Sequence, residues 1–129
     1  MSELDPNIKI LVVDDFGTMR RLISQILSHL ELKNVDVAND GEEGLKKINS
    51  KQYDLLLIDW NMPVMSGLEL LQEARKLENY KMTPIIMVTA EALKENILAS
   101  VQAGASGYIV KPFNAATMED KIKKAFRIT

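Results

Sequence analysis

The sequence contains no cysteine, which excludes disulfides and thiolate metal sites and is typical of a reducing compartment. It also lacks any apolar run near the roughly 20 residues that a membrane-spanning helix needs. The segment from Met1 to Pro6 has neither a basic region nor an apolar core, so we expect no secretion signal. Sixteen basic and 18 acidic residues give a net charge of −2, without the positive excess typical of general nucleic-acid binding. We therefore expect a cytoplasmic protein that binds neither membranes nor nucleic acids.

The bulk composition is that of a globular protein with one core. The chain has 129 residues, of which 47% are hydrophobic and 26% are charged. A chain of this length is near the commonest size of a single domain. We expect one domain over residues 1–129, acting as a monomer.

The stretch from Ile10 to Asp15 organises the chain. Four consecutive apolar residues, three of them β-branched, are followed at once by Asp14 and Asp15. A short, continuous apolar run is typical of a strand that is buried on both faces of a parallel sheet. Two later apolar runs end in the same manner, at Asp59 and at Thr89.

Strand and helix patterns alternate along the whole chain. The expected strands are about Ile8–Val13, Val35–Ala38, Tyr53–Asp59, Ile85–Thr89 and Gly107–Lys111. Between and after them, apolar residues recur at helical spacing of three and four. The first helix is expected to bury Met19, Leu22, Ile23, Ile26, Leu27 and Leu30, and the fourth to bury Leu93, Ile97 and Val101. Asp40, Ser66 and Asn114 are the expected N-caps of the second, third and fifth helices.

This alternation predicts an α/β fold: a doubly wound, flavodoxin-like, five-stranded parallel sheet with five helices. Each connection is long enough for a helix, so neighbouring strands should be parallel with right-handed crossovers. The second strand alternates apolar and polar residues, which favours an edge position. These features fit the strand order 2-1-3-4-5, in which a crevice opens between the carboxyl ends of strands one and three.

That crevice should contain Asp14, Asp15 and Asp59, which end strands one and three. Two carboxylates about 4 Å apart repel each other by roughly 4 kcal/mol at an effective dielectric of about 20. The cluster must therefore bind a proton or a cation, and hard oxygen ligands favour Mg²⁺. The alternative, that Asp14 and Asp15 only cap the first helix, does not explain why Asp59 ends the neighbouring strand.

Thr89 and Lys111 end strands four and five, beside the same crevice. A lysine can lay its stem along apolar surface and deliver its ammonium group to the carboxylates. An ammonium group and a hydroxyl opposite a metal ion can hold a phosphoryl group, and a carboxylate can accept one. Local patterns do not decide which aspartate is the acceptor; Asp59 is favoured because it ends the central strand.

At this point the motifs resemble those of response-regulator receiver domains, in particular the chemotaxis branch. The similarity runs from about Ile8 to Phe126. The matching stretches are Leu11–Phe16, Thr18–Arg21, Asp59–Pro63, Met87–Ala92, Lys94–Ile97, Gln102–Tyr108 and Val110–Phe113.

The resemblance implies a site in which Asp59 accepts a phosphoryl group with Mg²⁺ as cofactor. Asp15, Asp59 and the main-chain carbonyl of Asn61 would bind Mg²⁺ directly, and Asp14 would bind it through water. The same likeness implies that Asn61 tunes how fast the acyl phosphate hydrolyses.

The resemblance also implies how the signal is read. Thr89 and Lys111 would hold the phosphoryl oxygens, while Thr89 and Tyr108 would move together as a switch. Glu91 would help to tune hydrolysis, and the Lys111–Pro112 peptide bond would be cis.

The implied partners are a histidine kinase as phosphodonor, the flagellar motor switch protein as target, and a dedicated phosphatase. The protein would catalyse only its own phosphorylation and dephosphorylation, so it is not expected to be an enzyme. It would switch the face built from helix four, strand five and helix five. The chain departs from the family pattern at Gly17 and at Val64–Ser66, and its second strand and helix match poorly. These departures leave the chemistry intact but leave kinase choice and hydrolysis rate open.

Three alternatives stay open from the residues. A phosphorelay shuttle unrelated to motility would use the same chemistry. A Mg²⁺-dependent phosphohydrolase would use Asp59 as nucleophile, but Asn61 occupies the position where such enzymes have a second acid. A flavin-binding protein of the same fold would want a phosphate-binding loop after strand one, where this chain has two carboxylates.

Overall fold

The computed structural model describes residues 4–90 and 93–127. The strands are β1 (Ile10–Val13), β2 (Val35–Ala38), β3 (Leu55–Asp59), β4 (Ile85–Thr89) and β5 (Gly107–Val110). The helices are α1 (Gly17–His29), α2 (Gly41–Ser50), α3 (Gly67–Lys76), the 3₁₀ helix η1 (Glu78–Tyr80), α4 (Lys94–Gln102) and α5 (Ala115–Ala125). Within the described ranges, no helix has the length and apolar character needed to cross a membrane.

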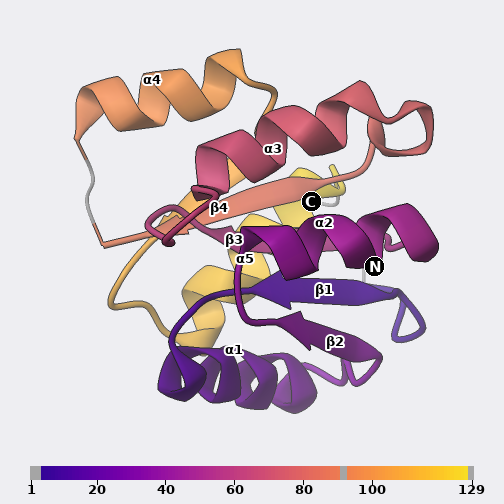
Figure 1. The fold of residues 1–129 in the computed structure, drawn as a ribbon. Helices are drawn as coiled ribbons and strands as arrows, with labels where there is room; N and C mark the ends of the chain where they lie inside the picture. Colours follow the sequence, from indigo (N-terminus) through magenta and orange to yellow (C-terminus); the bar gives the residue numbers. More distant parts are fainter. Residues whose placement is uncertain (1–3, 91–92, 128–129) are drawn as a thin grey trace.

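The strands form one parallel sheet in the order β2-β1-β3-β4-β5, as predicted. In its register, Val13 pairs with Ile58 of β3, and Asp59 pairs with Val88 of β4. The residues that follow β1, β3 and β4 therefore emerge together at one edge of the sheet (Figure 1).

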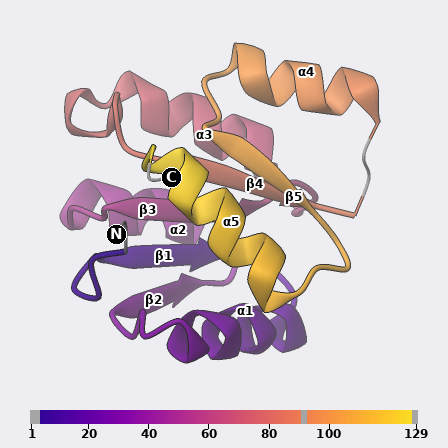
Figure 2. The same cartoon turned by 180° about the vertical axis from the view of Figure 1, so that it is seen from behind.

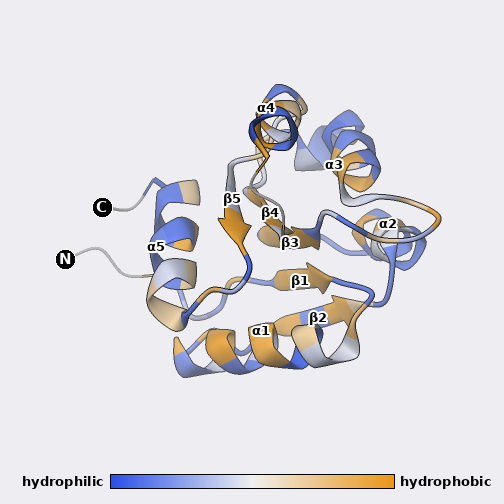
Figure 3. Ribbon diagram, turned by 90° about the vertical axis from the view of Figure 1, so that its left-hand side faces the viewer, coloured by the Kyte–Doolittle hydropathy of each residue, from blue (hydrophilic) through white to orange (hydrophobic). Residues whose placement is uncertain are grey.

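Two hydrophobic layers cover the sheet, one on each face. Successive strand residues alternate between them: Leu11 and Val13 pack with the layer under α2 and α3, while Ile10 and Val12 pack with the layer under α1 and α5. Figures 1 and 2 show these helix pairs from opposite sides of the sheet. In Figure 3 the strands are mostly hydrophobic, whereas the helices are striped. This is the pattern expected of strands buried on both faces.

The predicted N-caps are confirmed. Asp40 accepts a hydrogen bond from the Glu43 N–H at 2.9 Å, and Asn114 accepts one from the Thr117 N–H at 2.8 Å. Ser66 and Glu69 form a reciprocal capping box at the start of α3. Each cap satisfies main-chain donors that have no partner inside the helix.

Some predicted boundaries are wrong by one or two residues. β1 begins at Ile10 rather than Ile8, β3 begins at Leu55 rather than Tyr53, and β5 ends at Val110 rather than Lys111. Hydrophobic runs extend past the hydrogen-bonded ladder, because residues outside the ladder are still buried in the core. Tyr53, for example, is only 2% exposed, although it precedes β3.

The residues predicted to be buried on the inner face of α4 are wrong. Leu93 and Val101 are exposed, and Ile97 is only half-buried. The residue of α4 that is buried is Ser100, whose hydroxyl donates to the Asn96 carbonyl at 2.8 Å. The apolar spacing did not reveal this residue, because Ser100 is polar and its hydroxyl is satisfied within the helix. Leu22 of α1 is likewise exposed, although it was predicted to face the core.

Gly67, the first residue of α3, is required by a close approach to the end of β3. A Cβ atom at this position would lie 2.1 Å from the Asp59 carbonyl oxygen. The Gly67 N–H also donates to the Trp60 carbonyl at 3.0 Å, which fixes the loop between β3 and α3. The backbone conformation around Asp59 is therefore possible only because residue 67 is a glycine, which has no side chain.

We predict that Gly67→Ala lowers the free energy of unfolding by about 3 kcal/mol, because backbone atoms at this contact cannot move aside. Gly107→Ala is the matched control: nothing lies within 4 Å of its added Cβ, so its effect should stay below about 1 kcal/mol. Urea unfolding of both variants measures the difference. Equal stabilities would show that the β3–α3 loop relaxes without cost.

Candidate functional site

Three carboxylates meet at the carboxyl edge of the sheet, where the sequence predicted them. Asp14, Asp15 and Asp59 each offer an oxygen atom within 4.8 Å of the others. Asp14 and Asp59 are 1% and 6% exposed, whereas Asp15 is exposed. The first two are held in the protein interior, and the third faces solvent.

The Asp14 residue is fixed by main-chain contacts on both sides. Its N–H donates to the Ala38 carbonyl at 3.2 Å, and its Oδ1 accepts from the Phe16 N–H at 2.9 Å. The Arg20 guanidinium donates to the Asp14 carbonyl at 2.7 Å. The sequence analysis assigned no role to Arg20. Its position in the first turn of α1, six residues after Asp14, is the feature that could have indicated this contact.

Lys111 delivers its ammonium group to the carboxylates, as its position predicted. The Nζ atom donates to Oδ2 of Asp14 at 3.3 Å and to Oδ1 of Asp59 at 3.1 Å. The Lys111 N–H donates to the Thr89 carbonyl at 2.7 Å, which ties the residue after β5 to the end of β4. The Lys111–Pro112 bond is cis, as the resemblance implied. One cation thus neutralises part of the charge of two buried anions.

Burial and charge leave Asp59 hard to ionise. The pKa of Asp59 is raised to about 6, mainly by removal of the carboxyl group from water and next by the nearby Asp14 carboxylate. Lys111 acts in the opposite direction, and Asp15 adds a smaller increase. At neutral pH the carboxylate is mostly ionised, but its charge is only partly compensated. Such a group favours binding of a further cation.

The donor set fits Mg²⁺. It consists of three carboxylates and neighbouring main-chain carbonyls, which are hard oxygen ligands without nitrogen or sulfur. Asp15, on the solvent side of the cluster, leaves room for the waters that Mg²⁺ retains. Asp14, Asp15 and Asp59 would hold the ion.

The remaining predicted residues lie around this cluster. Thr89 is 4% exposed and ends β4 one residue after Val88, the pairing partner of Asp59. Asn61 is exposed in the loop after β3. Tyr108 is half-buried in β5, with its ring 4.7 Å from the Lys121 Nζ atom. Glu91 lies outside the described residues.

The match to known proteins places the chain in a family. Residues 10–123 match the response regulator receiver domain model, and the chain belongs to this family. The resemblance predicted from its motifs is thereby confirmed.

Within the family, the chain is similar to chemotaxis proteins. It is 46% identical to chemotaxis protein CheY-3 of Vibrio cholerae, over 95% of both chains. It is 48% identical to chemotaxis protein CheY of Pseudomonas aeruginosa, over 92% of this chain and 95% of the relative.

Solved structures agree with this placement. V. cholerae CheY4 superimposes with a TM-score of 0.86 at 36% identity, covering 92% of this chain and 98% of CheY4. The response regulator TrrA of Thermotoga maritima, solved in complex with Mg²⁺-BeF, gives a TM-score of 0.81 at 42% identity, again covering 92% and 98%. The chain is thus a CheY-type receiver of two-component systems.

We predict that Asp59→Asn stabilises the metal-free protein at neutral pH. A carboxyl group whose pKa rises from 3.8 to about 6 on folding binds its proton more tightly in the folded state. Stability is therefore lost as pH rises from about 4 to 6, and the variant avoids a cost of about 2–3 kcal/mol at pH 7.5. The gain should disappear near pH 4, and Mg²⁺ should stabilise the wild type more than the variant.

Urea unfolding with chelator or with Mg²⁺, at the two pH values, measures these differences. Asp120→Asn is the control, because Asp120 is exposed and pairs only with Lys124 at 3.2 Å. Its effect should be below about 0.5 kcal/mol at either pH. A gain for Asp59→Asn that persists unchanged at pH 4 would rule out ionisation of the buried Asp59 as its cause.

Proposed function

We propose that this protein is a phosphorylation-activated chemotaxis response regulator. It accepts a phosphoryl group on Asp59 from a histidine kinase, with Mg²⁺ as cofactor. It then switches the face formed by α4, β5 and α5 to bind the flagellar motor switch protein. In this proposal residues 1–129 act in the cytoplasm as a single monomeric receiver, and a dedicated phosphatase ends the signal.

The observation that carries the proposal is the Lys111 ammonium group between Asp14 and Asp59, at 3.3 and 3.1 Å. The contact keeps a nucleophilic carboxylate, a cation and a second carboxylate within one partly closed site. We assign Asp59 as the acceptor because it ends the central strand, between the Asp14–Asp15 pair that follows β1 and Thr89 and Lys111 at the ends of β4 and β5. Asp15 is too exposed to be shielded from water in the same manner.

The reaction is an in-line transfer between two residues. An oxygen of ionised Asp59 attacks the phosphorus of a phosphohistidine, a P–O bond forms, and the P–N bond breaks as the imidazole leaves with a proton. Mg²⁺, held by Asp14, Asp15, Asp59 and the Asn61 carbonyl, supplies charge neutralisation. Lys111 exchanges its contact with the Asp59 carboxylate for a phosphoryl oxygen, and Thr89 donates to another.

The switch uses the same strands. Thr89 ends β4 and pairs with Val110 of β5, two residues from Tyr108. A movement of Thr89 toward the phosphoryl group can therefore pass to Tyr108 through adjacent main chain. The face that would respond exposes Leu98 and Val101 on α4 and carries several lysines on α5. Such a surface suits an acidic, apolar peptide segment. Asn61 and Glu91 are the residues we assign to the tuning of hydrolysis.

We predict that acetyl phosphate with Mg²⁺ labels the wild-type protein and not Asp59→Asn, because the variant lacks the acceptor oxygen. Lys111→Met should reduce the labelled fraction at least tenfold by removing the cation that stabilises the phosphoryl oxygens. Intact mass spectrometry measures the adduct. Asp120→Asn should label as the wild type does, and labelling of Asp59→Asn would move the acceptor to another residue.

We further predict that copurification with the motor switch protein rises after treatment with phosphodonor. Tyr108→Ala should abolish this gain while labelling at Asp59 continues, because the variant keeps the phosphoryl acceptor and lacks the switch side chain. Continued phosphoryl transfer to a histidine protein, with no gain in motor binding, would favour the phosphorelay shuttle. Rapid turnover on many phosphate esters would favour the phosphohydrolase.

A further inference from the structure

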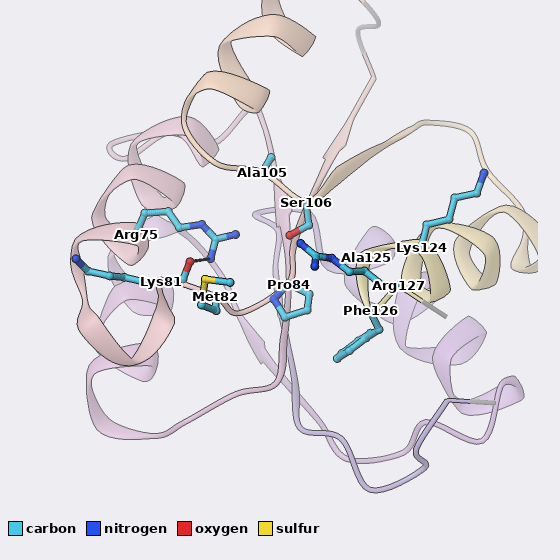
Figure 4. Close-up of a pocket in the computed structure, with 10 residues that line it drawn as sticks. All are labelled: Arg75, Lys81, Met82, Pro84, Ala105, Ser106, Lys124, Ala125, Phe126 and Arg127. Carbon is cyan, nitrogen blue, oxygen red and sulfur yellow. Dashed lines mark hydrogen bonds between the residues drawn. The ribbon is translucent and has the colours of Figure 1, made fainter. Parts of the chain in front are cut away.

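A second site lies at the opposite edge of the sheet from the carboxylates. A cavity of about 530 Å³ opens at the amino-terminal ends of β4 and β5, between the ends of α3 and α5 (Figure 4). It is lined by Arg75, Lys81, Met82, Pro84, Ala105, Ser106, Lys124, Ala125, Phe126 and Arg127. None of these residues takes part in the proposed phosphoryl transfer.

The lining contains four cationic residues and no carboxylate. Two of the four are already paired: Lys81 contacts Glu78 at 3.3 Å, and Lys124 contacts Asp120 at 3.2 Å. These two lysines point away from the cavity in Figure 4. The side chains of the two arginines point toward each other across the cavity, with Ser106 between them.

The two guanidinium groups have no carboxylate partner within residues 4–90 and 93–127, where every ion pair involves a lysine. Two like charges facing one cavity repel each other, and this repulsion is relieved when an anion lies between them. The chain as a whole has a net charge of −2, so this local excess of positive charge is a property of the cavity.

Arg75 is fixed in place by neutral acceptors. Its guanidinium donates to the carbonyls of Tyr80 and Thr83, both at 2.7 Å, and to the Gly104 carbonyl at 2.7 and 3.0 Å. Carbonyl groups orient the guanidinium but leave its charge uncompensated. Burial lowers the pKa of Arg75, in agreement with a cation that has lost water without gaining an anion. These contacts use four of its five N–H groups, so Arg75 offers a ligand its positive charge and the one remaining N–H of Nη2.

We propose that this cavity binds an organic phosphate of about nucleotide size, with the phosphate between Arg75 and Arg127. The Arg127 guanidinium can present its planar donor set to phosphate oxygens, Arg75 adds a positive charge and one N–H, and the Ser106 hydroxyl lies between the two arginines. The apolar remainder of the lining, Met82, Pro84 and Phe126, suits the organic part of the ligand. A cavity of this volume is larger than an inorganic phosphate ion would fill.

The test is a titration of the full-length, metal-free protein with adenosine 5′-monophosphate at low ionic strength. Chelator keeps the carboxylate cluster without a cation, so that cluster repels the probe. Side-chain Nε–Hε signals of Arg75 and Arg127 and the Ser106 amide signal should shift together in ¹⁵N NMR spectra. The Trp60 signal, at the other edge of the sheet, should not shift. Inorganic phosphate should bind more weakly than the nucleotide.

Arg127→Gln should weaken the affinity for the nucleotide by about tenfold, the loss expected for one charge-assisted contact. Arg127 is exposed at the end of α5, so its replacement should leave the fold intact. Arg21→Gln, which removes an exposed arginine of α1, is the control and should bind as the wild type does.

Three results would overturn the proposal. The arginine signals could stay unchanged at millimolar nucleotide, or Arg127→Gln could bind as tightly as the control. A tetraglutamate peptide could also bind more tightly than the nucleotide, which would assign the cavity to an acidic protein segment. The outcome does not depend on phosphorylation of Asp59, because no phosphodonor or Mg²⁺ is present.

Discussion

The mutual repulsion of Asp14, Asp15 and Asp59 is the constraint on which the carboxyl edge of this structure depends. Parallel strands bring the three carboxylates within 4.8 Å of one another, and the hydrophobic layers on both faces prevent them from separating. Lys111 compensates part of this charge through two contacts of 3.3 and 3.1 Å. Burial and the neighbouring carboxylates together raise the pKa of Asp59. A site kept in this state is less stable than a neutral one, which favours binding of a cation and, in the proposed function, of a phosphoryl group.

The surrounding scaffold keeps this arrangement from relaxing. Asp14 is held by hydrogen bonds from Phe16 and Arg20, and the backbone at Asp59 is held by the close approach of Gly67. Lys111 is tied by its own N–H to the Thr89 carbonyl. Main-chain contacts thus position Asp14, Asp59 and Lys111 in addition to the ion pairs among them.

The same topology produces both edges of the sheet. Parallel strands place all their carboxyl ends at one edge, where Asp14, Asp15 and Asp59 gather, and all their amino ends at the other. The end of α3 brings Arg75, and the end of α5 brings Arg127, to the cavity at the amino edge. Arg75 also contacts the Gly104 carbonyl, in the connection between α4 and β5. Through this contact, Arg75 joins the cavity to the loop between two elements of the proposed switch face.

The sequence by itself determined the layers, the strand order and the gathering of carboxylates, because hydrophobic period and strand-end position are local properties of the chain. The strand order was not independent of the resemblance, since CheY proteins share it. Tertiary structure alone decided which face of α4 is buried: Leu93 and Val101 have apolar spacing, yet the buried residue is Ser100, whose hydroxyl is satisfied by the Asn96 carbonyl. It also decided the roles of Arg20, Gly67 and Arg75, whose partners are main-chain carbonyls. Every residue carries such a carbonyl, so no side-chain pattern marks the one that a distant arginine or glycine will meet.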